Sequence, residues 1–390
     1  MSYNIAGTTQ GGYLVTQMVG FVYSDAFQKY NFGPTHPLRP TRLKLTFELM
    51  KASGLFNSPS IKMIEPRQAQ RGELLLFHDE SYLRLVERMS ESGSGFLDMG
   101  DTPAFKGCYE ASSLAVGASL TAVDTVMSGI ATHAMNIAGG LHHAHPNRAS
   151  GFCIFNDPAV SIAYLKEKYS LNRILYLDID AHHGDGVMYG FYSDDSVLDI
   201  DFHEDGHALF PGTGFTEETG AGSASGIKIN VPLPPFTGDE TYLKLFKKIV
   251  PVAVRKFNPQ ILLVQCGADS HANDLLAHLQ LTTRSYCEIA STVHQLAHEV
   301  SDGRLVIFGG GGYNPSNVAR AWTLIAATLV GSNIPDDIPK DWRRLFEALV
   351  GEKAPDKINS YDEARETAEM PASHCSRMLD DLKHRISILN

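Results

Sequence analysis

The segment from residue 176 to residue 186 reads YLDIDAHHGDG and holds three aspartates and two histidines directly behind an apolar run. An ionised carboxylate that is buried without a partner destabilises a fold by several kcal/mol. This cluster therefore needs a counter-charge, and a metal ion supplies one. If residues 176–182 are extended, Asp178, Asp180 and His182 share one face of a strand. Two carboxylates and an imidazole without a thiolate suit zinc or ferrous iron.

A catalytic zinc site has three protein ligands and an open position. The third ligand should come from the end of another strand, and Asp269 in CGADSH is the best-placed carboxylate. A second group, His142 and His143 in GGLHHAH, provides either further ligands or proton-transfer groups, because imidazole titrates in the useful range. Such histidines need a carboxylate on the far ring nitrogen. Asp178 and Asp185 are available to hold them.

The elements that must position these residues are short apolar strands alternating with helices. Runs that read as strands lie at residues 133–140, 173–178, 197–203, 261–267 and 304–312. Segments with helical spacing lie at residues 111–127, 157–169, 240–257 and 314–331. Near-continuous apolar runs predict a mostly parallel sheet covered on both faces. Each run ends in polar or glycine-rich sequence, so the unusual residues should meet beyond the carboxyl ends of the strands.

Length and composition favour one large α/β domain. The chain has 390 residues, 43% of them hydrophobic and 20% charged, and shows no internal repeat or low-complexity linker. We expect a single domain over residues 1–390, in which residues 331–390 form a helical extension packed on the rest. The net charge of −11 argues mildly against a nucleic-acid-binding surface. Five scattered cysteines and the lack of a signal or membrane-spanning run predict a cytoplasmic protein.

Five long blocks resemble the signature sequences of the zinc-dependent histone deacetylase family. These blocks are GGLHHAHPNRASGFCIFND, LDIDAHHGDGV, FHEDGHALFPGTG, QCGADS and FGGGGYNPSNVARAW. They occur in the family's order and spacing, and the resemblance runs from roughly residue 10 to residue 330. Through GDTPAFKGCYEASSLAVGASLTAVD the chain is most similar to the bacterial acetoin utilisation deacetylases. The resemblance implies the arginase–deacetylase α/β fold, with a central parallel sheet of eight strands flanked by helices.

The resemblance also implies roles for individual residues. The implied zinc ligands are Asp180, His182 and Asp269. The implied catalytic group, in which Asp178 orients the first histidine and Asp185 the second, is His142, His143, Asp178, Asp185 and Tyr313. The implied substrate tunnel and its rim are Asp101, Gly151, Phe152, Phe210 and Leu276. Arg42 resembles the arginine of an internal cavity beneath the metal.

The chain departs from the eukaryotic members in two places. Asp201 replaces a serine that helps to hold a structural monovalent cation in those members. We expect a potassium ion bound by carbonyls near Asp178, Asp180, His182 and Phe202, with Asp201 strengthening this site. The second departure is HPNR, residues 145–148, which we expect at the surface.

The leading hypothesis is a metal-dependent lysine deacetylase that hydrolyses Nε-acetyl-lysine in proteins to lysine and acetate. The expected substrate partner is an acetylated metabolic enzyme such as acetyl-CoA synthetase, with no nucleic acid or membrane involved. A small-molecule amidohydrolase acting on acetylpolyamines is the alternative within the same fold. A catalytically silent binding scaffold is disfavoured because candidates for all three ligands, both histidines and the tyrosine are intact. A eukaryotic chromatin deacetylase is disfavoured because the chain has no basic nuclear-import run and no long tail.

Overall fold

The computed structural model describes residues 18–364 and 372–389. The beginning of the family resemblance, at residues 10–17, and the two ends of the predicted domain lie outside this part of the chain.

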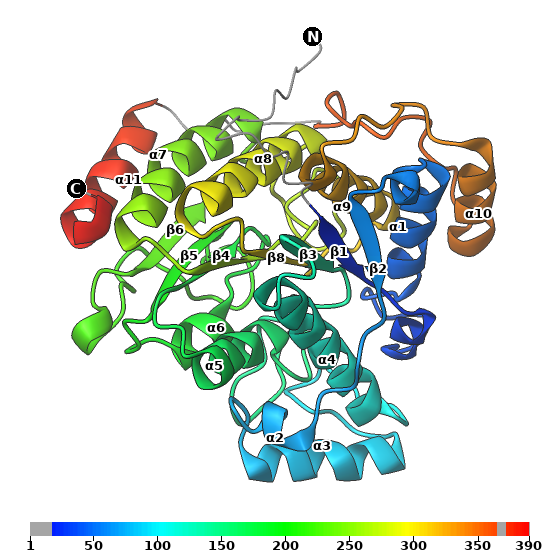
Figure 1. The fold of residues 1–390 in the computed structure, drawn as a ribbon, viewed down its shortest axis with the longest axis horizontal. Helices are drawn as coiled ribbons and strands as arrows, with labels where there is room; N and C mark the ends of the chain where they lie inside the picture. Colours follow the sequence, from blue (N-terminus) through cyan, green and yellow to red (C-terminus); the bar gives the residue numbers. More distant parts are fainter. Residues whose placement is uncertain (1–17, 365–371, 390) are drawn as a thin grey trace.

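The described chain folds around one parallel sheet of eight strands in the order β2-β1-β3-β8-β7-β4-β5-β6 (Figure 1). The strands are β1 (Val19–Val22), β2 (Ile61–Ile64), β3 (His133–Asn136), β4 (Ile174–Asp178), β5 (Val197–Glu204), β6 (Lys228–Leu233), β7 (Ile261–Gln265) and β8 (Leu305–Phe308). The predicted central parallel sheet of eight strands is confirmed.

Helices cover both faces of the sheet (Figure 1). One layer contains α1 (Thr41–Ala52), α7 (Asp239–Phe257), α8 (Thr283–Val300) and α9 (Pro315–Val330). The other contains α4 (Cys108–Met127), α5 (Asp157–Tyr169) and α6 (Asp185–Gly190), with α2 (Arg71–Leu74) and α3 (Glu80–Ser92) beyond them. Every residue of β3, β4, β5, β7 and β8 is buried, as coverage of both faces requires.

The remaining helical elements lie at the ends of the chain and in loops. Near the C-terminus, α10 (Lys340–Val350) packs against α1, and α11 (Ala372–Arg385) packs against α7. Four short 3-10 helices complete the described part: η1 (Asp25–Lys29), η2 (Leu55–Asn57), η3 (Gly222–Ala224) and η4 (Ser387–Leu389). The segment 351–364 between α10 and the undescribed residues is irregular, so the predicted helical extension is only partly helical.

The five strands predicted from apolar runs are the five contiguous strands β3, β8, β7, β4 and β5. The sequence patterns missed β1, β2 and β6, which lie toward the two edges of the sheet. Two of the four residues of β2 are exposed, and β6 contains a lysine and a proline, so neither reads as an apolar run. The predicted ranges 133–140 and 304–312 extend too far, because the chain leaves the sheet where the glycines begin.

The register of the sheet brings the last residues of β3, β8, β7 and β4 to one level, beside Asp201 of β5. Asn136 of β3 lies opposite Phe308 of β8, and Phe308 lies opposite Gln265 of β7. Gln265 lies opposite Asp178 of β4, which in turn lies opposite Asp201 of β5. The loops that carry the charged and glycine-rich sequences therefore leave the sheet side by side.

Candidate active site

Asp180, His182 and Asp269 converge beyond the ends of β4 and β7. His182 Nδ1 lies 3.1 Å from Asp180 Oδ1 and 3.1 Å from Asp269 Oδ2. All three side chains are buried, and one ligand atom of each lies within 4.8 Å of the others. Two carboxylates and one imidazole at this separation can hold a divalent cation.

The backbone that carries Asp180 and His182 is not part of a strand, although the sequence pattern predicted one there. β4 ends at Asp178, so residues 179–182 are not extended and the predicted shared face is wrong. The Asp178 carboxylate faces the tandem histidines instead, because its Oδ2 accepts a hydrogen bond from Tyr176 Oη at 2.6 Å and lies 2.7 Å from His142 Nδ1. A turn after the strand, rather than strand periodicity, presents Asp180 and His182 to Asp269.

The donor groups around the two carboxylates fit a metal ion. The outer oxygen of Asp180, Oδ2, accepts hydrogen bonds from Gln265 Nε2 and from the Gly311 N–H, both at 2.7 Å. Asp269 Oδ1 accepts one from the Ala181 N–H at 2.8 Å. One oxygen of each carboxylate is thus fixed by the protein while the other faces the shared centre. Gln265 was not predicted, although it is the polar residue that ends the apolar run ILLVQ.

The two carboxylates and the His182 ring shift one another's pKa values. Burial raises the pKa of Asp269 to about 7, and the neighbouring Asp180 carboxylate raises it in the same direction. Burial alone would lower the pKa of His182, but its hydrogen bonds to Asp180 and Asp269 raise it well above the ordinary value. A divalent ion held here would supply the positive charge and leave both carboxylates ionised.

Gly311 is required where the four-glycine run passes the metal group. A Cβ atom at this position would lie 1.9 Å from Asp269 Oδ2 and 2.8 Å from Asp180 Oδ2. We therefore expect Gly311→Ala to displace a ligand and weaken metal binding by about 10–100-fold. Metal content by mass spectrometry after equilibration in a zinc buffer measures this. Gly72→Ala is the matched control, because no atom lies within 4 Å of its added Cβ. Equal metal affinity in the two variants would contradict the assigned packing.

The tandem histidines lie beside the metal group, each with a carboxylate on its far nitrogen. His142 Nδ1 lies 2.7 Å from Asp178 Oδ2, and His143 Nδ1 lies 2.7 Å from Asp185 Oδ1. The two Nε2 atoms are 3.1 Å apart, and His142 Nε2 lies 4.0 Å from Asp180 Oδ1. Both rings line one cavity, together with Gly151, Phe152 and Tyr313 among other residues; we refer to it as the active-site cavity.

The environment gives the two imidazoles opposite charge preferences. Burial would lower the pKa of His142, but the charges of Asp178 and Asp180 raise it to about 10. Burial lowers the pKa of His143 to about 4, and the charge of His142 acts in the same direction. A cationic ring and a neutral ring therefore share one cavity wall.

Asn156 and Asp157 hold the backbone of residues 140–142, the loop that carries the tandem histidines. The sequence patterns did not predict this role. The Asp157 carboxylate accepts hydrogen bonds from the N–H groups of Gly140 at 3.0 Å and Leu141 at 2.8 Å. Asn156 Nδ2 donates to the His142 carbonyl at 2.8 Å, while the Asn156 Oδ1 caps α5. Asp157 is the first residue of the helical segment predicted at residues 157–169, and that pattern gives no sign of this role. Its burial beneath a glycine pair could not be read without the tertiary structure.

The predicted tunnel residues lie at the mouth of the active-site cavity. The Phe210 ring is 5.1 Å from the His143 ring and 43% exposed, while the Phe152 ring is 5.8 Å from the Tyr313 ring. Gly151 passes between them so closely that a Cβ atom would lie 2.5 Å from His143 Cδ2 and 2.9 Å from Phe210 Cε1. These aromatic rings flank the approach to the histidines.

Asp101 and Leu276 lie further out. Asp101 is exposed, and its carbonyl oxygen lies 3.2 Å from Nε2 of His36, whose ring packs 4.5 Å from that of Phe152. Leu276 is 37% exposed, and its N–H donates to Asp274 Oδ1 at 2.9 Å. Each residue is thus one contact removed from the lining of the active-site cavity, Asp101 through His36 and Leu276 through Asp274, which also accepts from the Tyr313 N–H.

Tyr313 follows the four glycines, and its backbone N–H donates to Asp274 Oδ2 at 2.8 Å. Its ring lies perpendicular to the His182 ring at 6.3 Å, and burial raises the pKa of its hydroxyl well above the ordinary value. Arg42 is buried in α1 and donates to the Gly310 carbonyl at 2.6 Å, with its guanidinium 5.2 Å from the Trp322 ring. It lines a second cavity that shares Leu38 and Leu141 with the active-site cavity.

Asp201 and Phe202, both predicted for the potassium site, have side chains in different surroundings. Both carboxylate oxygens of Asp201 are engaged, one 2.6 Å from His203 Nδ1 and the other accepting from the Gly184 N–H at 2.7 Å. The Phe202 side chain packs on the rings of Tyr242 and Phe246 in α7. The side chain of Asp201 therefore fastens the turn after β4.

Comparison with known proteins agrees with the family resemblance of the sequence. The histone deacetylase domain model matches residues 36–329. The chain is 44% identical over 313 residues to the acetoin utilization protein AcuC of Bacillus subtilis (strain 168), covering 78% of this chain and 80% of that one. It is 39% identical to AcuC of Staphylococcus xylosus, covering 82% and 84% of the two chains.

A solved structure extends the agreement to three dimensions. This structure, described as the crystal structure of an HDAC homolog complexed with SAHA, superposes with a TM-score of 0.81 at 30% identity. The match covers 95% of this chain and 100% of that one. No helix among the described residues is long and apolar enough to span a bilayer. From the matched domain, the shared fold and the identity to relatives, we conclude that the chain belongs to the histone deacetylase family and is a deacetylase of this metal-dependent, typically zinc-dependent, class.

Proposed function

We propose that the chain hydrolyses the amide of Nε-acetyl-lysine in proteins, with Asp180, His182 and Asp269 as zinc ligands. The observation that carries the proposal is the arrangement of these ligands beside two histidines whose Nε2 atoms are 3.1 Å apart in one cavity. When bound, zinc supplies Lewis acidity toward an amide carbonyl and toward water. Ferrous iron suits the same ligands and is the alternative metal.

The two histidines would have different roles in the reaction. His143 Nε2 faces the cavity while Asp185 holds its Nδ1, so a neutral ring takes the proton of the attacking water and then gives it to the leaving lysine amine. His142, held by Asp178 and favoured in its charged form, stabilises the negative charge that develops on the substrate oxygen. The pair therefore supplies a base and a fixed positive charge.

Tyr313 would complete the site for the developing oxyanion. Its hydroxyl stays protonated because burial raises its pKa well above the ordinary value, and it donates a hydrogen bond to the substrate carbonyl oxygen. We expect Tyr313→Phe to lower kcat by about 10²–10³-fold, the usual loss for one such donor. Metal content should stay at the wild-type value, because Tyr313 is not a ligand. Steady-state kinetics on an acetyl-lysine peptide measures the effect, and an unchanged kcat would remove the oxyanion role.

The cavity mouth would select the substrate. Phe152 and Phe210 offer apolar ring faces to a neutral acyl-lysine chain, whereas a bare ammonium loses hydration there. Gly151 leaves room for the chain between rings and histidines. Leu276 and the exposed Asp101 would contact the peptide outside, where the Asp101 carboxylate accepts hydrogen bonds from backbone N–H groups.

The name of the relatives supports a metabolic role. Because these relatives are described as acetoin utilization proteins, we propose an acetylated acyl-CoA-forming enzyme such as acetyl-CoA synthetase as the physiological partner. We also propose a reducing, cytoplasmic location, since none of the five cysteines forms a disulfide. A potassium ion held by backbone carbonyls near Asp178, Asp180, His182 and Phe202 belongs to the same proposal, with the Asp201 carboxylate as a nearby negative charge.

The decisive experiment compares acetyl-lysine peptides with acetylpolyamines, each with and without a chelator. We expect hydrolysis of peptides, loss of this activity with the chelator, and recovery on addition of zinc. Faster turnover of acetylpolyamines would replace the protein substrate by a small molecule. Absence of turnover on both classes by the zinc-loaded protein would indicate a binding scaffold. Adding SAHA tests the site directly, because a solved relative was crystallised with this compound.

A further inference from the structure

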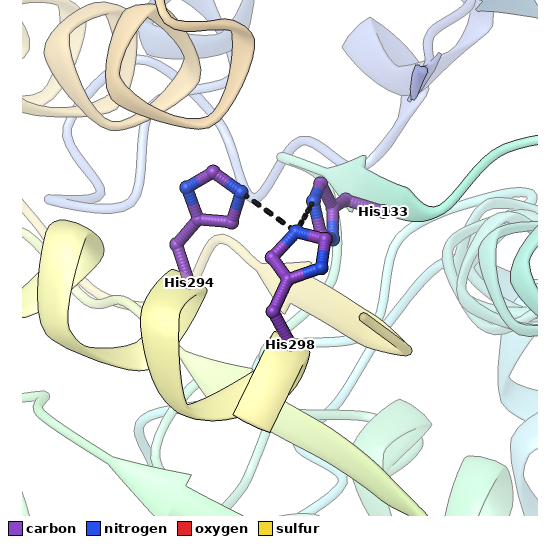
Figure 2. A group of neighbouring side chains, drawn as sticks. All are labelled: His133, His294 and His298. Atoms are coloured by element: carbon purple, nitrogen blue, oxygen red, sulfur yellow. Dashed lines mark hydrogen bonds between the residues drawn. The ribbon is translucent and has the colours of Figure 1, made fainter. Parts of the chain in front are cut away.

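A second group of metal-ligand side chains lies at the opposite end of the sheet from the active site. His133 is the first residue of β3, whereas the active-site loops follow the last residues of the strands. His294 and His298 lie one turn apart on the same side of α8, and Figure 2 shows all three rings facing one another. No local sequence pattern marks these histidines as a group, because 161 residues separate His133 from His294.

The ring nitrogens in this three-histidine cluster converge. His298 Nε2 lies 3.2 Å from His133 Nε2 and 3.1 Å from His294 Nε2. One nitrogen from each residue lies within 4.8 Å of the others. Tetrahedral zinc with Zn–N bonds of about 2.0–2.1 Å separates its ligand nitrogens by about 3.3–3.4 Å. The separations of 3.2 Å and 3.1 Å come close to this value, so little movement is needed to surround an ion.

The two contacts between the facing Nε2 atoms cannot both be full hydrogen bonds. The nitrogen of a neutral imidazole carries either one hydrogen or one lone pair. His298 Nε2 faces two other Nε2 atoms, so at most one of these contacts is a full hydrogen bond. A metal ion at the centre would instead accept all three lone pairs.

The surroundings favour neutral rings, the form that binds metal. Burial lowers the pKa of His133 to about 3, and the charges of His294 and His298 act in the same direction. Burial lowers the pKa of His294 to about 4 and also lowers that of His298. Neutral imidazole is the ligand form of histidine, so the lone pairs are available near neutral pH.

We propose that His133, His294 and His298 form a second metal site, which binds a divalent transition-metal ion of the zinc class. Three nitrogen ligands suit zinc, nickel and copper, and do not suit magnesium or calcium. His133 is buried and His298 is exposed, so the fourth coordination position faces solvent. An ion bound here would fasten the start of β3 to α8. It would stabilise the native chain without taking part in amide hydrolysis.

The test uses the full chain with its catalytic site loaded. After equilibration in a zinc buffer, we expect two zinc ions per wild-type chain by mass spectrometry. His294→Gln and His298→Gln should each weaken the second site by more than about 100-fold and leave one ion, because each removes a direct ligand. Both variants should keep deacetylase activity and lose the rise in thermal midpoint that excess zinc gives the wild type. His207→Gln, at an exposed histidine outside both groups, is the matched control and should keep two ions.

Variants of the catalytic site separate this proposal from the proposed function. Asp269→Asn should lose the catalytic ion and keep the second, and cobalt substituted into that variant should show the absorption of a tetrahedral nitrogen site. One zinc ion per wild-type chain, or equal zinc content in the wild type and in both α8 variants, would overturn the second site. Either result would leave the catalytic assignment intact.

Discussion

Asp269→Asn is expected to empty the catalytic metal site and to lower kcat/KM by roughly 10⁴-fold or more. The metal supplies several kcal/mol of transition-state charge stabilisation, and each 1.4 kcal/mol corresponds to about tenfold in rate. The amide keeps the size of the side chain, and its oxygen can still accept the hydrogen bond from the Ala181 N–H. What is lost is the charged oxygen that lies 3.1 Å from His182 Nδ1. The fold should therefore survive while the ligand set does not.

Metal content and peptide hydrolysis, measured on the same preparation, check this prediction. Asp199→Asn is the matched control, because Asp199 is also buried in the sheet and burial raises its pKa well above the ordinary value. The amide keeps the shape of this side chain, and Asp199 is not one of the three metal ligands. We expect the control to keep its metal and most of its activity. A fully active Asp269→Asn protein without metal would disprove the site assignment.

His143→Ala is expected to lower kcat by about 10²–10⁴-fold while the metal stays bound. His143 shares a hydrogen bond with Asp185 and approaches the ligand His182 only through an edge-to-face ring contact at 5.9 Å, so its removal takes away the proton carrier and no ligand atom. The added space lies in the active-site cavity, which already has access to solvent through its mouth. Single-turnover kinetics on an acetyl-lysine peptide isolates the chemical step from product release.

His145→Gln controls for disturbance of Asp185, because His145 Nε2 lies 3.1 Å from the other oxygen of that carboxylate. This histidine does not line the active-site cavity, so we expect a loss below about tenfold, the size of one hydrogen bond. Equal losses of activity in His143→Ala and His145→Gln would indicate that the reaction depends on Asp185 rather than on His143.

The amino-acid sequence determined the chemistry of this protein through short-range order. Asp178, Asp180 and His182 lie within five residues, directly after a run apolar enough to be a buried strand. Parallel strands end at one edge of a sheet, so Asp269 and the tandem histidines could be assigned to the same place before any contact was known. Those assignments depended only on residue types, spacing and family resemblance.

The tertiary structure decided how those residues divide their tasks. The turn after β4 sends Asp178 toward His142 while Asp180 turns toward Asp269, an outcome that strand periodicity predicted wrongly. The strands β1, β2 and β6, of which β2 and β6 are the edges of the sheet, are defined by their neighbours rather than by their own pattern.

Contacts between distant segments also supply residues that no local pattern marks. Gln265 reaches Asp180 across two adjacent strands, and Asp157 holds the backbone of Gly140 and Leu141, which precede it by 17 and 16 residues. His133 meets His298 only because β3 and α8 pack together, at a separation of 165 residues. A sequence pattern reports which side chains can bind a proton or a metal. Whether three of them share one centre depends on long-range packing, which local periodicity does not encode.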